Sequence, residues 1–218
     1  MNKHKQIWET IADDIQEGIL SGDYKPWERL VEADLAAKYS VSHTPVREAL
    51  RYLSNLGFVE IVPRTMVRVK GLDKKEIEDL GAIQCVLEEL AVLNAVPNLR
   101  ERHFKEMEKS IARIEKHYNR KEYLEYEEAN VRFHETIWKA SDNNELIIML
   151  ENIYNRIHRF RAVTRRYPAK SKDLIDVHKE ILKAAVQMDS KKAATLTRSH
   201  LEEFFQDVIS FLEKDESL

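Results

Sequence analysis

The sequence is poor in the residues that mark disulfide-rich, loop-rich and membrane-spanning proteins. It has one cysteine, Cys85, which excludes an internal disulfide framework and suits the cytosol. Glycine and proline number five each in 218 residues, which argues against a loop-rich or all-β fold. No apolar run approaches the ~18 residues that a membrane span needs, and the N-terminus lacks the apolar core of a signal peptide. We therefore expect a cytoplasmic, mainly helical protein that does not span a membrane.

The charge of the chain is slightly negative overall but unevenly distributed. The net charge is −3, which by itself does not suggest a nucleic-acid partner. Residues 1–37 carry four basic and eight acidic side chains, whereas residues 38–70 carry six basic and two acidic side chains, a net +4. Phosphate contacts supply much of the affinity of DNA-binding proteins, so a positive segment in an acidic chain is compatible with a DNA-binding face.

That positive segment overlaps a stretch, residues 31–56, that predicts two short helices joined by a tight turn. The second helix has an apolar stripe at helical spacing; it consists of Val46, Ala49, Leu50 and Leu53. Arg47 and Arg51 fall four residues apart on another face. Either Thr44, followed by Pro45, or Ser42 caps this helix. A helix in the DNA major groove reads bases with its first turns, so the pattern predicts a helix-turn-helix that binds double-stranded DNA.

The flanking segments complete a winged helix and define a second domain. Residues 5–20 predict a first helix, and residues 58–62 and 66–70 predict a two-stranded hairpin, or wing. We place the DNA-binding domain at residues 1–72. Residues 73–218 show no strand and divide at five breaks into about six helices. The expected fold is mainly α: an N-terminal winged helix-turn-helix with a small β-hairpin wing, followed by an antiparallel all-α bundle.

The run ADLAAKYSVSHTPVREALRYLSNLGFVEI resembles the winged-helix domain of GntR-type bacterial transcription regulators, and the helical remainder resembles the FCD domain of their FadR-like branch. The resemblance covers nearly the whole chain. It implies a homodimeric transcription regulator, usually a repressor, that reads a palindromic operator and responds to a ligand in the helical domain. The groove-facing and wing residues it implies are Ser42, His43, Thr44, Arg47, Arg51 and Arg64.

Three positions depart from the family pattern. Trp27 stands where a glycine usually follows the proline of the loop, His43 replaces the usual arginine of the recognition motif, and Thr65 follows Arg64 where the wing tip usually carries a glycine. An arginine such as Arg47 can bind guanine through two hydrogen bonds, worth roughly 1–3 kcal/mol of discrimination. The alternative is that Arg47 pairs with an acidic side chain on a solvated surface.

Three histidines of the second domain predict a meeting point inside the bundle. His178 and His200 lie eleven residues on either side of Asp189, so an antiparallel hairpin with its turn there places the two imidazoles level with each other. His134 lies on an earlier helix, with Asn130 one turn before it on the same face. Imidazole nitrogens suit Zn, Ni or Cu, and an amide oxygen is a weak fourth ligand. The alternative is that each is a hydrogen-bonded core histidine.

The family resemblance favours a metal. Metal-binding FCD domains use an acidic residue and three histidines, and residues 130–134, NVRFH, match the pattern D-x-x-F-H except that Asn130 replaces the aspartate. The implied cofactor is a divalent transition metal, Zn or Ni, that anchors a small carboxylate effector. Gln84 stands at the position of the usual pocket arginine, and Arg156 is a candidate to contact the effector.

Two other functions remain open from the residues. In a metal sensor, Zn or Ni would itself be the signal, and a purely structural metal is a further alternative. In a metalloenzyme, the three histidines would activate water. The sequence shows no aspartate or glutamate that can be assigned as a general base beside His134, His178 or His200. We therefore do not expect an enzyme.

Overall fold

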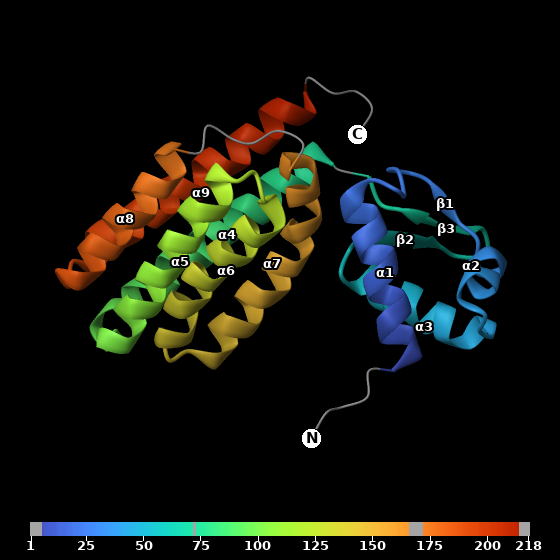
Figure 1. The fold of residues 1–218 in the computed structure, drawn as a ribbon, viewed down its shortest axis with the longest axis horizontal. Coiled ribbons are helices and arrows are strands. Elements are labelled where there is room, and N and C mark those ends of the chain that lie inside the picture. Colours follow the sequence, from blue (N-terminus) through green and yellow to red (C-terminus); the bar gives the residue numbers. More distant parts are fainter. Residues whose placement is uncertain (1–5, 72, 166–171, 214–218) are drawn as a thin grey trace. The chain divides into compact units, whose positions relative to one another are not determined.

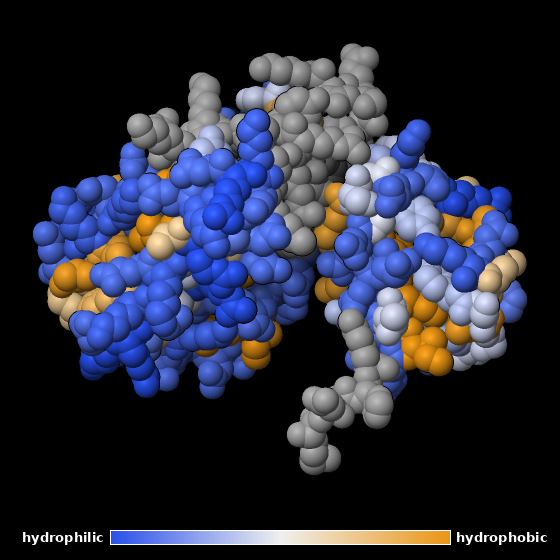
Figure 2. Space-filling model, viewed as in Figure 1, coloured by the Kyte–Doolittle hydropathy of each residue, from blue (hydrophilic) through white to orange (hydrophobic). Residues whose placement is uncertain are grey.

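The computed structural model describes residues 6–71, 73–165 and 172–213 (Figure 1). The chain forms two compact units, the first built mainly from residues up to Lys74 and the second mainly from the residues after it. The expected domain boundary at residue 72 lies outside the described residues and remains a prediction. On the face drawn in Figure 2, hydrophilic side chains predominate and apolar ones form separate patches.

The first unit is a winged helix. Its elements are the helices α1 (Ile7–Ser21), α2 (Glu32–Tyr39) and α3 (His43–Asn55) and the strands β1 (Arg29–Leu30), β2 (Val59–Val62) and β3 (Met66–Val69). The sheet is antiparallel with the order β1-β3-β2, so it has three strands instead of the expected two. The expectation missed β1 because two residues are too few to show the alternation that identifies a strand; only pairing with β3 makes them one.

The apolar stripe of α3 forms the centre of this unit, as predicted. All four stripe residues are buried, and they pack against residues from α1, α2 and the sheet, among them Ile11, Ile15, Leu35 and Val59. Ser40, in the left-handed conformation at φ 55°, ends α2 and begins the turn of the helix-turn-helix. Of the two expected caps, Ser42 is the N-cap residue of α3, and Thr44 lies inside the helix.

Two non-glycine residues have a positive φ at or next to positions where the resemblance implies glycine. Trp27 has φ 67° and Arg64 has φ 62°. The guanidinium of Arg68 lies over the Trp27 ring, 4.8 Å from its centroid, and a Cβ atom at Gly71 would lie 2.2 Å from the indole. A left-handed conformation is unfavourable for residues with a side chain, so surrounding contacts must hold Trp27 in place. Trp27 thus has the left-handed conformation that a glycine adopts without steric cost.

The second unit is an all-helical bundle, and six α-helices follow Asp73 in the described residues, as expected. They are α4 (Lys74–Ala95), α5 (Glu101–Asn119), α6 (Tyr123–Ala140), α7 (Asn144–Arg165), α8 (Lys172–Val186) and α9 (Ser190–Leu212), with a short 3₁₀ helix, Val96–Asn98, after α4. Helix α7 belongs to this unit only as far as Tyr154. The main core joins side chains from α4, α5, α6, α8 and α9, including Met107, Phe133 and Ile181. A smaller cluster packs α7 on α4 and α6 through Leu146, Leu150, Ala91 and Trp138.

Helix α4 is unusually apolar. With the 3₁₀ turn that follows, residues 74–98 pass a length and hydropathy test for a membrane span, with a mean hydropathy of 1.3 and half of that window buried in the bundle. Core helices of soluble proteins pass the same test, so this finding is weak evidence for a membrane span. The large apolar side chains of α4 that stay exposed are Ile83, Val86, Leu90 and Leu93.

Candidate functional site

The residues expected to read DNA lie on one exposed surface of the first unit. Ser42, His43, Thr44 and Arg47 occupy the N-cap and first turns of α3, and all four are exposed, as is Arg51 one turn further on. Because Val46 and Leu50 of the same helix are buried, the exposed set faces away from the core. The structure therefore brings the predicted helix residues together on an accessible helix end.

An ion pair joins the two helices of the motif at this surface. Nε of Arg47 donates to Oε2 of Glu32, at the start of α2, over 2.7 Å, and the Arg47 side chain keeps 61% of its surface exposed. Surface ion pairs contribute ~0–1 kcal/mol, so the pairing does not prevent Arg47 from moving to a base or phosphate. The acidic partner expected under the alternative interpretation of Arg47 thus exists, and it is Glu32.

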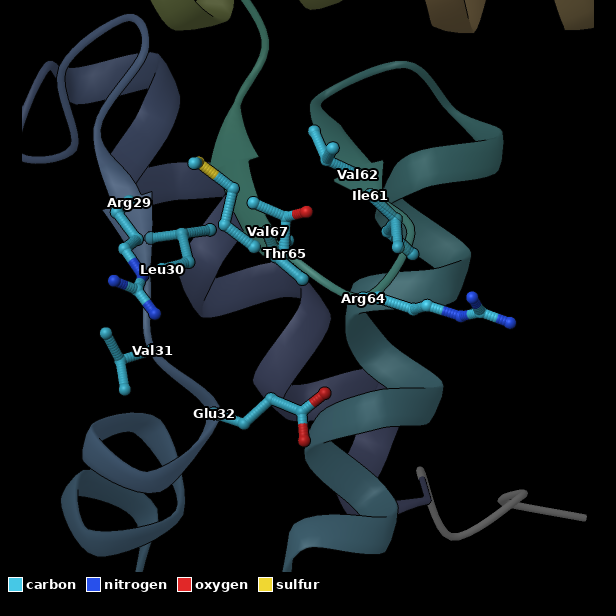
Figure 3. Close-up of a pocket in the computed structure, with 10 residues that line it drawn as sticks. Arg29, Leu30, Val31, Glu32, Ile61, Val62, Arg64, Thr65 and Val67 are labelled. Atoms are coloured by element: carbon cyan, nitrogen blue, oxygen red, sulfur yellow. The ribbon is translucent and has the colours of Figure 1, made fainter.

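The wing presents Arg64 at its tip. Arg64 lies in the turn between β2 and β3, and its side chain points away from Arg29 and Glu32 (Figure 3). A surface pocket of about 300 Å³ lies between this turn and the segment that joins β1 to α2. The pocket is lined by both charged and apolar side chains, among them Arg29, Glu32, Ile61 and Met66. The exposed guanidinium of Arg64 is therefore accessible to a phosphate backbone.

Three histidines converge in the second unit, as the spacing predicted. His134 of α6, His178 of α8 and His200 of α9 are all buried, and one nitrogen of each ring can be chosen so that the three lie within 4.8 Å of one another. The ring centroids of His178 and His200 are 4.6 Å apart, and that of His134 lies 5.5 and 5.7 Å from them. His178 and His200 lie at the same height along their helices, because each is the same number of residues away from the turn that joins α8 to α9.

A buried carboxylate, which the sequence interpretation missed, orients one of these rings. Glu88 of α4 is fully buried, and its Oε2 atom lies 3.2 Å from Nδ1 of His134 and accepts from the Trp138 indole N–H over 2.9 Å. Nε2 of Gln84 donates to its Oε1 atom over 3.2 Å. Burial raises the pKa of Glu88, but the charge of His134 and these hydrogen bonds outweigh burial, so the pKa lies below its usual value.

The sequence interpretation assigned no aspartate or glutamate as a general base, and it did not place Glu88 beside His134. Glu88 is separated from His134 by 46 positions, so no local spacing links them. A signal was present, however, because Gln84 and Glu88 lie one turn apart on the apolar, inward face of α4, where a charged residue requires partners. Glu88 is occupied by His134, Trp138 and Gln84, an arrangement that suits orienting an imidazole more than accepting a proton from water.

The donor set fits a transition metal. Nε2 of His134 is buried and makes no hydrogen bond within the described residues, while its Nδ1 faces Glu88. A metal-binding histidine characteristically directs its second nitrogen at a carboxylate in this way, which fixes the tautomer and the ring orientation. Three imidazoles from three helices match the ligand preferences of Zn and Ni. The expected fourth donor, Asn130, is buried on α6 one turn before His134.

The two expected effector-pocket residues differ in position. Gln84 is buried and is linked to His134 through Glu88. Arg156 is exposed on α7. The structure thus connects Gln84 to the histidine cluster, and it places Arg156 on the exposed surface of α7.

Comparison with known proteins agrees with both halves of this architecture. Residues 7–69 match the family described as bacterial regulatory proteins, gntR family, and residues 79–203 match the FCD domain. The chain is 29% identical to the uncharacterized HTH-type transcriptional regulator YdhC of Bacillus subtilis over 83% of this chain and 80% of YdhC. It is 27% identical to the gluconate operon transcriptional repressor of the same organism, over 91% of this chain and 82% of the repressor.

Solved structures show the same fold. Escherichia coli McbR/YncC aligns with a TM-score of 0.78 and 21% identity over 94% of this chain and 98% of that chain. A putative GntR regulator from Rhodococcus sp. RHA1 aligns with a TM-score of 0.75 and 19% identity over 93% and 97%.

Fold and comparisons together define a transcription regulator with a winged helix-turn-helix DNA-binding domain and an FCD effector domain. The chain belongs to the GntR family of bacterial regulators, in its FadR-like, FCD-containing branch. The relatives and fold neighbours reported above are transcription regulators, not enzymes.

Proposed function

We propose that this regulator is a cytoplasmic repressor that binds a palindromic operator as a homodimer and releases it when a small carboxylate effector binds at a metal in the FCD domain. The observation that carries the proposal is the convergence of His134, His178 and His200, buried, with ring nitrogens within 4.8 Å of one another. The proposal assigns DNA reading to the exposed end of α3 and to the wing.

For DNA reading, the first turn of α3 enters the major groove. Ser42, His43 and Thr44 approach the bases or the flanking phosphates, and Arg47 leaves Glu32 to bind a guanine. Arg51, further along the helix, and Arg64 at the wing tip bind phosphates. The exposure of all six residues supports this assignment, as does the positive charge of residues 38–70.

For effector binding, His134, His178 and His200 hold Zn or Ni, and Asn130 is a weak additional donor. When bound, the metal supplies a Lewis-acidic site for a carboxylate group. Glu88 keeps His134 oriented, and its neutral neighbour Gln84 lines the pocket where the family usually places an arginine. Replacing aspartate by Asn130 removes a negative charge, which favours an anionic ligand. A contact from Arg156 remains a prediction from the sequence.

Release follows from geometry. Two half-sites on B-DNA are spaced by about 34–36 Å or a multiple of it, so a ligand that changes the placement of the two winged helices lowers operator affinity. The coupling is reciprocal, and operator DNA must weaken effector binding by the same factor. An effector that binds both arrangements equally would have no effect.

The metal site is tested by elemental analysis of protein purified without added metal and then offered Zn or Ni. The parent and a His103→Ala/His117→Ala double variant should hold about one equivalent per subunit, because neither control histidine belongs to the buried cluster. A His134→Ala/His178→Ala variant should hold little. Equal metal in all three proteins, or none in the parent, contradicts the proposed site.

DNA reading is tested with an operator selected from a random duplex library. The selected sequence should be palindromic. Arg47→Ala should weaken binding by about 5- to 150-fold and relax the preference at one base pair of each half-site, as loss of a guanine contact implies. Arg113→Ala, which removes an exposed arginine of α5, is the matched control. Equal operator affinity in the Arg47→Ala variant contradicts the assignment of Arg47.

The operator complex also separates effector control from metal sensing. Small mono-, di- and tricarboxylates are added to the metal-loaded complex, and in a parallel sample the metal is removed by a chelator. Release by a carboxylate while the metal stays bound supports the proposal. If operator binding changes only with removal of the metal, the protein is a metal sensor. If neither treatment changes operator binding, the metal is structural.

A further inference from the structure

Gln84 presents a buried oxygen atom that has no hydrogen-bond partner within the described residues. The residue lies on the inward face of α4 and is 2% exposed. Its Nε2 atom donates to Oε1 of Glu88 over 3.2 Å, whereas its Oε1 atom accepts no hydrogen bond from the part of the chain described. A buried acceptor without a donor destabilises a protein, because it has given up its hydrogen bonds to water. Gln84 is therefore suited to a donor that comes from outside the chain.

The contact with Glu88 fixes which end of the Gln84 amide is left over. A carboxylate offers only oxygen atoms and has no hydrogen to donate. Turning the amide over would bring its oxygen against the Glu88 oxygen and would take the amide N–H group away from its acceptor. The nitrogen therefore faces Glu88, and the atom that remains is an acceptor.

Glu88 also connects Gln84 to the three buried histidines. One carboxylate oxygen of Glu88 holds the Gln84 amide, and the other lies 3.2 Å from Nδ1 of His134. Nε2 of His134, at the other end of the ring contact, is buried and makes no hydrogen bond within the described residues. Gln84 is thus a neighbour of the carboxylate that orients a proposed metal ligand, which places it beside the proposed effector site.

The acceptor limits what an effector can place next to it. A hydroxyl or an ammonium group donates a hydrogen bond to Oε1 and satisfies it. A carboxylate brings only acceptor atoms, and it would also meet the negative charge of Glu88 beside Gln84. An unsubstituted alkyl chain leaves the oxygen buried and unpaired. Gln84 therefore distinguishes three kinds of acid that could all bind a metal through one carboxylate.

We propose that the effector is a monocarboxylic acid that carries a hydroxyl or ammonium group, and that this group donates to Oε1 of Gln84. The inference rests on the metal-bound carboxylate effector of the proposed function and adds the chemistry of the effector's other end. The carboxylate binds the metal that the three histidines hold, and Gln84 selects the acid by its second group. Dicarboxylates and unsubstituted acids are the ligands that this site rejects.

Calorimetry on the metal-loaded full chain compares acids that differ in one group. Propionate and butyrate are the unsubstituted references, and succinate is the dicarboxylate. Lactate, 3-hydroxypropionate and 4-hydroxybutyrate place a hydroxyl at increasing distance from the carboxylate, and alanine, β-alanine and 4-aminobutyrate do the same with an ammonium group. The best donor-bearing acid should bind about 5- to 150-fold more tightly than the reference of equal length, as pairing of one buried acceptor implies. Succinate should bind more weakly than that acid.

Substitution of Gln84 tests whether this residue makes the selection. Gln84→Met keeps the length of the side chain and removes the acceptor, so the advantage of the donor-bearing acid should fall below about threefold. Gln84→Arg offers only N–H groups, and succinate should then bind more tightly than that acid. Gln187→Met, at an exposed position after α8, is the matched control and should keep the parent ratio. Comparing two acids in one variant cancels any change in metal affinity, and circular dichroism confirms that each variant is folded.

The outcomes separate this inference from the function on which it rests. Propionate, butyrate or succinate binding as tightly as every donor-bearing acid overturns the role of Gln84 and leaves the carboxylate effector in place. A preference for a donor that persists in Gln84→Met protein has the same meaning. A metal-loaded chain that binds none of these acids overturns both. A donor-bearing acid that releases the operator from the parent and loses its advantage in Gln84→Met protein supports both.

Discussion

Glu88 offers the sharpest test of how the fold builds the proposed metal site. The substitution Glu88→Gln keeps the size and shape of the side chain and removes its charge. The Glu88 carboxylate faces Nδ1 of His134 at 3.2 Å and accepts the Trp138 N–H at 2.9 Å. Both contacts are made by Oε2, whereas Oε1 accepts from Nε2 of Gln84. An amide has one oxygen and no charge, so the variant keeps acceptors for at most one of these two groups of contacts. Hydrogen bonds to an uncharged acceptor are weaker, so His134 would be held less firmly even where the amide oxygen faces it.

The size of the effect follows from this role. Loss of a carboxylate that orients a metal-binding histidine typically lowers metal affinity by 10- to 100-fold, equivalent to ~1.4–2.7 kcal/mol. Because Glu88 is fully buried and no longer charged in the variant, part of the lost hydrogen bonding is offset by a smaller desolvation cost. We therefore expect the variant to remain folded while binding Zn or Ni more weakly.

The assay is competition between the protein and a metal-binding dye, with thermal unfolding measured in parallel. Glu89→Gln is the matched control: it is the same change at the next residue, whose carboxylate pairs at the surface with Arg198. It should bind metal like the parent. If folded Glu88→Gln protein binds metal within about threefold of the parent, Glu88 does not orient His134 and the reasoning is refuted.

Three further predictions concern stability and reactivity. Gly71→Ala should lower the free energy of unfolding by about 1–3 kcal/mol in chemical denaturation, because its Cβ would lie 2.2 Å from the Trp27 indole. Asp14→Asn should lower the free energy of unfolding by about 0.5–1 kcal/mol at neutral pH, measured by urea titration. The hydrogen bond from Tyr39 lowers the pKa of Asp14 in the folded chain. The difference between variant and parent should therefore be present above about pH 4 and disappear as the pH falls through the folded-state pKa. Burial raises the pKa of the Cys85 thiol to about 11, so iodoacetamide at pH 8 should label the folded chain at least about 100-fold more slowly than the unfolded chain. A rapid reaction of the folded chain would contradict the burial of this thiol.

Most of the fold was predictable because local patterns dictate it. The buried stripe of α3 follows from the spacing of Val46, Leu50 and their neighbours, and the turns between the bundle helices follow from short polar breaks. Strand β1 was not predictable, since two residues adopt strand geometry only through pairing with β3. Trp27 and Arg64 also adopt a left-handed backbone that no residue preference favours at those positions.

The candidate metal site was predictable in part. The equal distances of His178 and His200 from the turn at Asp189 placed those two rings together, because helix rise is the same on both arms. His134 was expected to join them because it shares a helix face with Asn130 and because residues 130–134 match the family pattern. Glu88 was missed because its contact with His134 spans 46 positions, and packing between α4 and α6 decides it.

The sequence by itself determined the winged helix, the helical bundle and the three histidines, because helical periodicity, turn residues and a specific motif act over a few neighbouring positions. Only the tertiary structure decided which acidic residue meets each functional side chain: Glu32 with Arg47, and Glu88 with His134. It also decided which apolar face of α4 stays exposed. The physical reason is that burial and ion pairing depend on how distant helices pack, and local patterns carry no information about that packing.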